Sequence, residues 1–187
     1  MDAILASASP RRQSLLQMVL PAFSVAPADI DESLPTGIAA EDAAEYLAAQ
    51  KAAAVADLHP DALVIGCDTT VVIDAKILGK PKDTADCYQM LQQLSGRTHC
   101  VYTGVCLRMG EAERCFTVCT YVSFYTLTQE EIQAYIATGE PFDKAGGYGI
   151  QGLGAMLVEK IDGDFYNVVG LPVARLLREL TAFTEQG

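Results

Sequence analysis

Basic residues are scarce in this sequence. It contains 13 lysines and arginines against 24 aspartates and glutamates, a formal net charge of −11. Nonspecific binding to nucleic acid, or to an anionic membrane, needs a basic surface, so the composition argues against both partners. The protein can still bind a small polyanion if its few basic side chains lie together in one cleft. Six of the thirteen precede residue 83, at Arg11, Arg12, Lys51, Lys76, Lys80 and Lys82.

Histidine clusters, paired cysteine motifs and long apolar runs are missing as well. The only two histidines, His59 and His99, have no obvious metal ligand beside them in the sequence, which argues against a zinc site or a His-based triad. The six cysteines show no C-x-x-C motif and no metal-ligand spacing, so we predict reduced thiols and a cytoplasmic location. No run approaches the length of a membrane span, and the apolar stretch after Met1 is too short for a signal peptide.

The residues that are present predict one domain over 1–187. Half of them are apolar, and no linker rich in proline, glycine or serine divides the chain. Strand-like and helix-like patterns follow one another along the chain. We expect strands at 4–6, 62–73, 77–78, 98–108, 114–125 and 155–161, and helices at 10–19, 39–58, 84–94, 129–138 and 171–183.

The first strand runs directly into a helix that begins at Pro10, with Ser9 as its N-cap. Arg11 and Arg12 occupy the first helical turn, where the helix dipole disfavours cations. Free amides, hydroxyls and two guanidinium groups at one strand-to-helix corner suit an anion such as phosphate. A solvated surface pair is the alternative interpretation of the two arginines.

Lys51 falls within the apolar stripe of the alanine-rich helix at 39–58, a stripe formed by Ala40, Ala44, Leu47, Ala54 and Leu58. A lysine on an inward face either extends its ammonium to the surface or reaches a cleft. Before this helix, Asp29, Asp31 and Glu32 close an extended segment. That acidic cluster is either solvated or part of a metal site.

Asp68 interrupts an apolar strand that carries the signature of burial on both faces. A buried acid is costly unless it is paired, hydrogen-bonded or bound to a cation, so Asp68 is the strongest functional candidate from the residues alone. A turn at 74–76 returns the chain so that 77–78 lie alongside 71–72. This pairing sets Lys80 opposite a residue between Thr69 and Val71, within reach of Asp68, although a slip of one residue would reverse the faces.

A glycine-rich stretch from Glu140 to Gly154 contains G-x-G-x-x-G at Gly147, Gly149 and Gly152. A dinucleotide-binding site would need an apolar strand directly before these glycines, and Pro-Phe-Asp-Lys-Ala is not one. The sequence has no Walker-type phosphate loop either. We expect an irregular loop in which the backbone approaches its neighbours closely, with Gln151 as the one amide side chain able to read the edge of a base.

Six short motifs, in order along nearly the whole chain, carry a resemblance to a known family. They are S-A-S-P-R-R at 7–12, G-C-D-T at 66–69, G-K-P at 79–81, L-S-G-R-T at 94–98, A-G-G-Y-G-I-Q-G at 145–152 and Y-N-V-V-G-L-P at 166–172. Together they resemble the Maf family, septum-formation proteins regarded as nucleoside triphosphate pyrophosphatases. Cys67 and Gly147 stand where alanine is common in that family. The resemblance implies an α/β fold similar to the inosine triphosphate pyrophosphatases: a long, twisted mixed sheet flanked by helices, with two lobes around a central cleft.

The resemblance also implies a role for each candidate. Asp68 is the expected proton acceptor or a metal ligand, and Glu32 is the second acid beside a divalent cation, Mg²⁺ or Mn²⁺. The phosphates are expected to contact Ser7, Arg12, Lys51 and Lys80. The branch that hydrolyses dTTP and UTP is distinguished by residues that correspond to Arg11, Thr69 and Gln151.

The implied reaction is attack of water on the α-phosphorus, which gives a nucleoside monophosphate and pyrophosphate. It would serve to keep modified nucleotides out of nucleic acid or to arrest cell division. Two alternatives stay open: the sister branch that acts on 7-methyl-GTP, and a nucleotide-binding division regulator with little turnover. The expected partner is the nucleoside triphosphate, with a homodimer as a further prediction and no nucleic acid or membrane.

Overall fold

A single mixed sheet forms the frame of the molecule. The computed structural model describes residues 2–185. The strands are β1 (Ala3–Leu5), β2 (Ser24–Val25), β3 (Leu63–Ile73), β4 (Lys76–Leu78), β5 (Thr98–Met109), β6 (Ala112–Phe124) and β7 (Val158–Asp162). Their order is β2-β1-β3-β5-β6-β7, and β4 also pairs with β3. β1 runs parallel to β2 and β3, and the other pairs are antiparallel.

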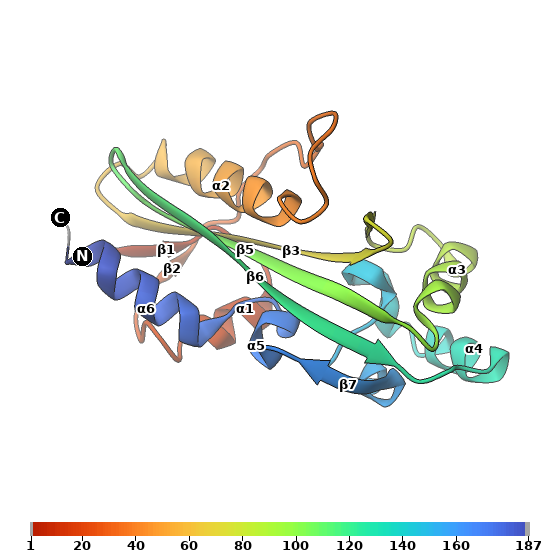
Figure 1. The fold of residues 1–187 in the computed structure, drawn as a ribbon. Coiled ribbons are helices and arrows are strands. Elements are labelled where there is room, and N and C mark those ends of the chain that lie inside the picture. The colour runs from red at the N-terminus through yellow and green to blue at the C-terminus, as the bar shows by residue number, and fades with distance from the viewer. Residues whose placement is uncertain (1, 186–187) are drawn as a thin grey trace.

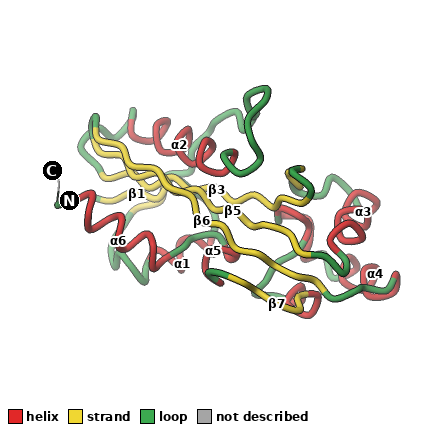
Figure 2. Tube along the Cα trace, in the orientation of Figure 1, coloured by secondary structure: helices red, strands yellow, loops and turns green. Residues whose placement is uncertain are grey.

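Helices cover both faces and the far end of this sheet. They are α1 (Pro10–Leu16), α2 (Ala43–Ala56), α3 (Thr84–Leu94), α4 (Gln129–Ala137), α5 (Phe165–Val169) and α6 (Val173–Thr184), with 3₁₀ turns at Glu140–Asp143, Ala145–Gly147 and Leu153–Leu157. α2 lies on one face, α1, α5 and α6 lie below the other, and α3 and α4 gather at the opposite end (Figure 1). The long strands β3, β5 and β6 connect the two ends (Figure 2). Over residues 2–185, no helix combines the length and apolarity that crossing a membrane requires.

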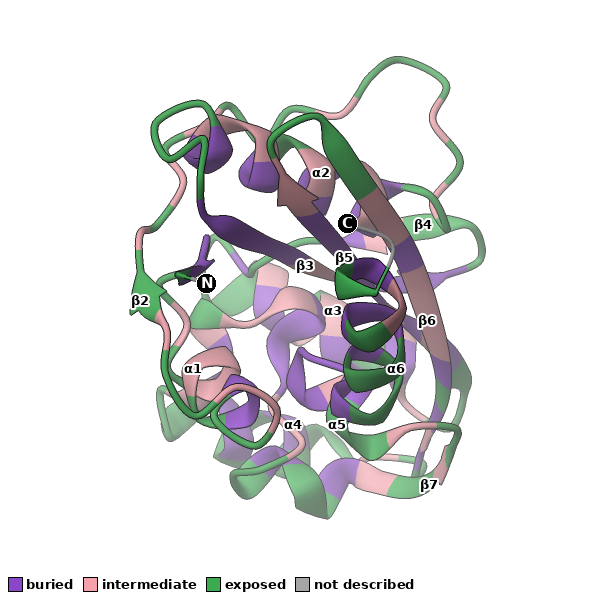
Figure 3. Cartoon of the chain, turned by 90° about the vertical axis from the view of Figure 1, so that its left-hand side faces the viewer, coloured by how far each residue is buried: buried purple, intermediate pink, exposed green. Residues whose placement is uncertain are grey.

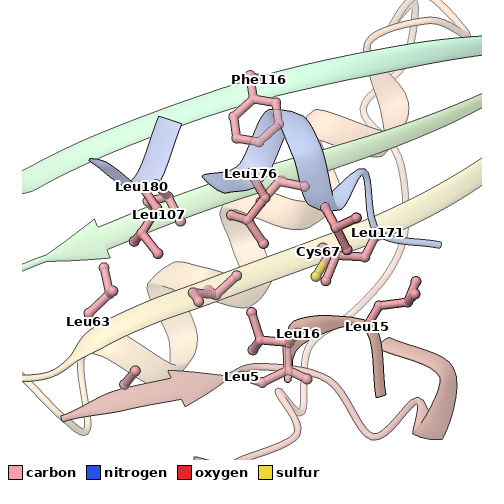
Figure 4. Packing of buried hydrophobic residues seen from close by; sticks show 14 of the residues in the cluster. Leu5, Leu15, Leu16, Leu63, Cys67, Leu107, Phe116, Leu171, Leu176 and Leu180 are labelled. Carbon is pink, nitrogen blue, oxygen red and sulfur yellow. The ribbon is translucent and has the colours of Figure 1, made fainter. Parts of the chain in front are cut away.

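Apolar side chains fill the space between the sheet and its helices. Leu5, Leu107 and Leu176 are fully buried in the cluster between the sheet and helices α6 and α1 (Figure 4). Each such leucine stabilises the fold by roughly 2 kcal/mol. The view from the end shows α6 placing its buried face on the sheet and its exposed face in solvent (Figure 3). Leu91 and Leu94 belong to a second cluster, around α3 and α4.

Helix α2 packs unusually close to the other face of the sheet. A Cβ atom at Gly66 would overlap the backbone of α2 at Ala48 and Ala52, and one at Gly104 would overlap it at Ala44. Two facing strands without side chains at these positions therefore let α2 rest directly on the backbone of β3 and β5. This contact brings Lys51, on the same face of α2, against β3.

The boundaries of several elements differ from those the sequence predicts. Helix α2 begins at Ala43 rather than at residue 39, and Leu58, predicted in its buried stripe, is exposed. Ala40 and Ala54 are only half-buried, because a helix so rich in alanine has no sharp apolar stripe. Residues 155–157 form a 3₁₀ turn instead of a strand. The expected last helix, 171–183, is α6, and a short helix that the sequence did not predict, α5, precedes it and ends before Gly170.

Two of the six cysteines contradict the prediction of reduced thiols. Cys106 on β5 and Cys115 on β6 are directly opposite neighbours and form a disulfide. Sequence spacing did not reveal this pair, because cross-strand partners are set by the register of the hairpin. Four other cysteines are free: Cys67, Cys87, Cys100 and Cys119.

Candidate active site

The predicted site residues gather at a gap in the sheet. β1 pairs with β3 at residues 63–65 and β4 pairs with it at 71–73, so within the described chain no strand covers this edge of β3 over 66–70. A cleft of ≈ 750 Å³ opens there, within the size range of small-molecule sites. Eight of the nine predicted residues line it: Arg11, Arg12, Glu32, Lys51, Asp68, Thr69, Lys80 and Gln151.

Asp68 and Thr69 reach different sides of the cleft from the middle of β3. Successive side chains on a strand point to opposite faces, so Asp68 faces α2 while Thr69 faces α1. Asp68 accordingly contacts Lys51, and Thr69 contacts Arg12. The cleft thus wraps around the exposed edge of one strand and collects charged groups from both layers of helices.

A three-membered charge cluster occupies the α2 side. The Lys51 ammonium nitrogen Nζ lies 2.6 Å from Asp68 Oδ1 and 2.7 Å from Glu32 Oε1. The side chains of Lys51 and Asp68 are 11% and 13% exposed, whereas that of Glu32 is 59% exposed. Among the described residues, none donates a hydrogen bond to Asp68 Oδ2. Asp68 therefore presents one oxygen to Lys51 and one to the cleft.

Mutual attraction keeps Lys51 and Glu32 charged. Burial alone would lower the pKa of Lys51, but the charges of and hydrogen bonds to Asp68 and Glu32 outweigh it and raise that pKa. The hydrogen bond from Lys51 lowers the pKa of Glu32 against the opposing effect of burial, and the charges of Lys51, Lys80 and Arg12 add to the lowering. One cation and at least one anion thus face the cleft throughout the neutral range.

Arg12 is held in place on the other side by three hydrogen bonds. Its Nη2 donates to Thr69 Oγ1 at 3.0 Å, its Nη1 to Ser7 Oγ at 3.2 Å, and its Nε to the Gly170 carbonyl at 3.0 Å. A guanidinium group has five donors, so two remain for a ligand. Ser7, the ninth predicted residue, is buried and is absent from the lining of the cleft. Its hydroxyl contacts Arg12 instead.

A chain of hydroxyl groups behind Arg12 orders it further. Thr103 Oγ1 donates to the Asn167 carbonyl at 2.9 Å and lies 2.9 Å from Thr69 Oγ1. Because the proton of Thr103 is used in this way, Thr69 is the donor to Thr103. Thr69 can then accept from Arg12 and direct its own proton inward. Thr103 was missed by sequence reasoning, and the Y-N-V-V-G-L-P motif supplies the carbonyls of both Asn167 and Gly170.

The β3–β4 pairing before Lys80 and the N-cap of α1 agree with the predictions from the sequence. β4 returns along β3 with Ile77 opposite Val72, after a two-residue turn at Asp74 and Ala75. Continued past the end of β4, this register sets Lys80 level with Thr69. On α1, the Ser9 hydroxyl accepts from the Arg12 amide, as an N-cap does.

The opposite wall of the cleft contains charged residues that the sequence did not single out. Glu140, Asp143 and Lys144 line the cleft beside Gln151. Asp143 Oδ2 lies 3.7 Å from Arg11 Nη1, and Asp143 Oδ1 lies 2.6 Å from Lys144 Nζ. The Lys144 charge and hydrogen bond lower the pKa of Asp143, and Arg11 adds to this. The adjacent charged residues Asp143 and Lys144, just before the glycine-rich loop, were the sequence feature from which this wall could have been predicted.

Glu32 and Asp68 form a donor set that fits a hard divalent cation. Lys51 contacts one oxygen of each carboxylate, Asp68 Oδ1 and Glu32 Oε1, and the second oxygen of each has no hydrogen-bond donor among the described residues. Mg²⁺ prefers oxygen ligands and is commonly bound by one or two carboxylates together with substrate phosphates. A soft metal would need thiolate or imidazole ligands, and none is found among the residues that line the cleft.

The geometry describes a class of protein: a mixed α/β sheet with a nucleotide-sized cleft in which cations surround a partly buried acid. Residues 2–183 match the family described as Maf-like protein, and the chain belongs to the Maf family. Among its relatives, the dTTP/UTP pyrophosphatase of Bacillus cytotoxicus is 53% identical over 96% of this chain and 94% of that protein. Those of Bacillus velezensis and of a Bacillus cereus strain are 49% and 48% identical, over 96% of this chain and 95% and 94% of theirs.

The fold recurs in a solved structure of distant sequence. "The structure of the Staphylococcus aureus Ham1 protein" matches with a TM-score of 0.56 and 16% identity, over 100% of this chain and 99% of that one. At this level of identity the match bears on the fold alone. It confirms the predicted architecture, a mixed sheet flanked by helices.

Proposed function

We propose that this protein is a nucleoside triphosphate pyrophosphatase that hydrolyses dTTP and UTP to the monophosphate and pyrophosphate. One observation carries the proposal: the Lys51–Asp68–Glu32 cluster lines the same cleft of ≈ 750 Å³ as Arg12 and Lys80. A buried acid among cations is what water attack on a polyphosphate requires. The names of relatives about half identical over nearly their whole length support the choice of dTTP and UTP.

Asp68 is proposed to accept the proton of the attacking water at Oδ2, the oxygen that Lys51 leaves free. Lys51 holds the other oxygen and so fixes the orientation of the carboxylate. The water attacks the α-phosphorus, its proton passes to Asp68, and pyrophosphate leaves with the electrons of the broken P–O bond. Such a reaction depends on positioning and charge neutralisation more than on covalent catalysis.

Cations on both sides of β3 are proposed to bind the phosphates. Arg12 has two free donors, and Lys51 and Lys80 add point charges. Ser7 is proposed to act on the phosphates through Arg12, with which it shares a hydrogen bond. Gathering these cations in one cleft explains how a protein of net charge −11 holds a triphosphate.

Glu32 and Asp68 are the residues proposed to hold Mg²⁺ or Mn²⁺. When bound, the ion would neutralise charge on the phosphates. Glu32 lies on the mostly exposed segment that precedes α2, and it reaches the cluster only through its carboxylate. Arg11, Thr69 and Gln151 are proposed to select the base. The cytoplasmic location and the homodimer stay predictions from the sequence.

The test is a substrate panel. Purified protein is incubated with Mg²⁺ or Mn²⁺ and with canonical, modified and 7-methylated triphosphates, and release of pyrophosphate and monophosphate is measured. We expect the highest kcat/KM for dTTP and UTP. A preference for 7-methyl-GTP would assign the protein to the sister branch. Tight nucleotide binding without turnover would favour the division regulator.

A further inference from the structure

The carboxylate of Glu140 is the centre of the wall that carries Gln151. Glu140 Oε2 accepts from the Leu153 amide at 2.8 Å, and Oε1 accepts from the Gly154 amide at 3.1 Å and from the Tyr135 hydroxyl at 3.0 Å. The Tyr135 hydroxyl in turn accepts from the Gly149 amide at 3.1 Å. Backbone amides on both sides of Gln151 are therefore tied to one pair of side chains.

The glycines of the G-x-G-x-x-G pattern are what allow this close approach. A Cβ atom at Gly152 would overlap the Glu140 carboxylate, and one at Gly149 would overlap the Lys144 side chain. At Gly154 it would lie 2.7 Å from the Tyr135 hydroxyl. Lys144 closes the arrangement with a hydrogen bond from Nζ to the Glu140 carbonyl at 2.7 Å. The glycines thus serve the packing of the loop around Glu140.

A charged acceptor suits this position better than a neutral one. Burial opposes ionisation of Glu140, but the hydrogen bonds from Gly154, Leu153 and Tyr135 outweigh it and lower its pKa. An ionised carboxylate only accepts hydrogen bonds, and three donors converge on it. Hydrogen bonds to a charged acceptor are about twice as strong as neutral ones, which suits an otherwise irregular segment.

We propose that Glu140, supported by Tyr135, is a positioning residue for base selection: it fixes the backbone at 149–154 so that Gln151 presents its amide to the nucleobase. This inference rests on the proposed function, because it assumes that a base enters beside Gln151. Glu140 acts through the loop, because among the described residues its carboxylate accepts hydrogen bonds from the Leu153 and Gly154 amides and the Tyr135 hydroxyl. Its loss should alter which triphosphate is chosen rather than how the α-phosphorus is attacked.

The test compares Glu140→Gln with wild type on dTTP and on dGTP. The side-chain NH₂ group of glutamine would face a backbone amide, that of Leu153 or Gly154, which is also a donor. One hydrogen bond to the charged carboxylate is therefore lost, and the loop becomes less ordered. We expect KM for dTTP to rise about tenfold and the dTTP-to-dGTP ratio of kcat/KM to fall about tenfold, with kcat for dTTP little changed. Tyr135→Phe, which leaves both amide bonds to Glu140, should shift the ratio in the same direction by about threefold.

Glu131→Gln is the matched control. Glu131 also accepts a hydrogen bond from a backbone amide, that of Thr128, but it does so in the capping box of α4. This variant should keep the wild-type KM and selectivity. Equal losses of kcat on every nucleotide in Glu140→Gln, or an unchanged selectivity ratio in both Glu140→Gln and Tyr135→Phe, would overturn the proposal.

A second measurement separates this inference from the proposed function. Amide hydrogen exchange over 145–154, read by mass spectrometry, should become faster in Glu140→Gln and stay at the wild-type rate in Glu131→Gln. If wild-type protein turns over no triphosphate, the proposed function fails, and calorimetric binding of dTTP and dGTP replaces kinetics as the readout of selectivity. Unchanged exchange in Glu140→Gln, or equal binding of the two nucleotides by wild type, would contradict the positioning role.

Discussion

The two walls of the cleft are built in different ways. The wall with Arg12, Lys51 and Asp68 stands on α1, α2 and β3, whose backbones are fixed by regular hydrogen bonding and by close packing on glycine. The wall with Gln151 consists of 3₁₀ turns and irregular loop, held by the side chains of Glu140 and Tyr135. Rigid elements carry the proposed chemistry, and a segment fastened by a few side chains carries the proposed selection of the base.

Asp68→Asn tests the first wall most directly and should have the largest effect. The amide cannot accept a proton from water, so we expect turnover to fall by about 10³-fold or more on every nucleotide, with the thermal unfolding transition retained. Asp74→Asn is the control, because Asp74 sits in the turn after β3 at a positive φ that asparagine tolerates. Near-wild-type turnover in Asp68→Asn, measured by pyrophosphate release, would refute the role assigned to this residue.

Lys51→Met should reduce kcat/KM by about 10²-fold on all substrates, because it removes a cation from the cleft and frees the Asp68 carboxylate. Without the ammonium, Glu32, a proposed metal ligand, loses the hydrogen bond that lowers its pKa, so it binds a proton more readily. The acidic limb of the pH–rate profile should therefore move to higher pH. The exposed Lys82, absent from the lining of the cleft, gives a control in Lys82→Met. An unchanged rate in Lys51→Met would mean that this lysine only bridges two acids.

Beneath the second wall, His99 makes stability depend on pH. Its ring nitrogen Nε2 lies 2.8 Å from the hydroxyl of Tyr148, which lines the cleft, and burial lowers the pKa of His99 to about 4. Between pH 6.5 and 4 the unfolded chain binds a proton that the folded chain does not, so stability falls as pH falls through this window, by about 3 kcal/mol in all. Above pH 6.5 this contribution is constant.

Urea unfolding of wild type and His99→Gln between pH 4 and pH 8 measures this dependence. Glutamine can replace the hydrogen bond to Tyr148 but does not titrate, so the difference in slope between the two proteins isolates His99. Parallel curves for the two proteins would mean that His99 takes up its proton equally well in the folded state.

The residues of the first wall could be predicted from the sequence because they break regular patterns. Asp68 interrupts an apolar strand, Lys51 interrupts the apolar face of a helix, and Ser9 precedes a proline where a helix begins. Each of these signals depends on a short-range period of the backbone. The hairpin of β3 and β4 that precedes Lys80 follows from the same local rules, whereas the fold class was predicted from the resemblance to the family.

Gln151 of the second wall could be predicted from the sequence, but the role of Glu140 and the disulfide could not, for physical reasons. Glu140 binds amides 13 and 14 residues away through an irregular loop, and no periodicity relates such partners. For the cysteines, the strands predicted at 98–108 and 114–125 fixed no register between them, whereas the observed pairing of Met109 with Ala112 leaves a two-residue turn. A register shifted by a single residue would place Cys106 opposite a neighbour of Cys115.

Thr103→Val tests the link between the two layers of the first wall with the smallest expected effect. Valine keeps the shape of the side chain but leaves the Asn167 carbonyl without its donor and Thr69 without its acceptor, a loss of about 1–3 kcal/mol in the free energy of unfolding. Arg12 then loses the ordering of its Thr69 partner, and kcat/KM should fall by roughly fivefold for dTTP, UTP and dGTP alike. Thr98→Val removes a hydroxyl paired with Ser123 at the other end of β5 and should leave the kinetics unchanged. Steady-state kinetics on the three substrates decide the outcome. An equal loss on all three would show that Thr103 acts by ordering Arg12, whereas a change in base preference comparable to that of Glu140→Gln would show that it acts through the proposed role of Thr69 in base selection.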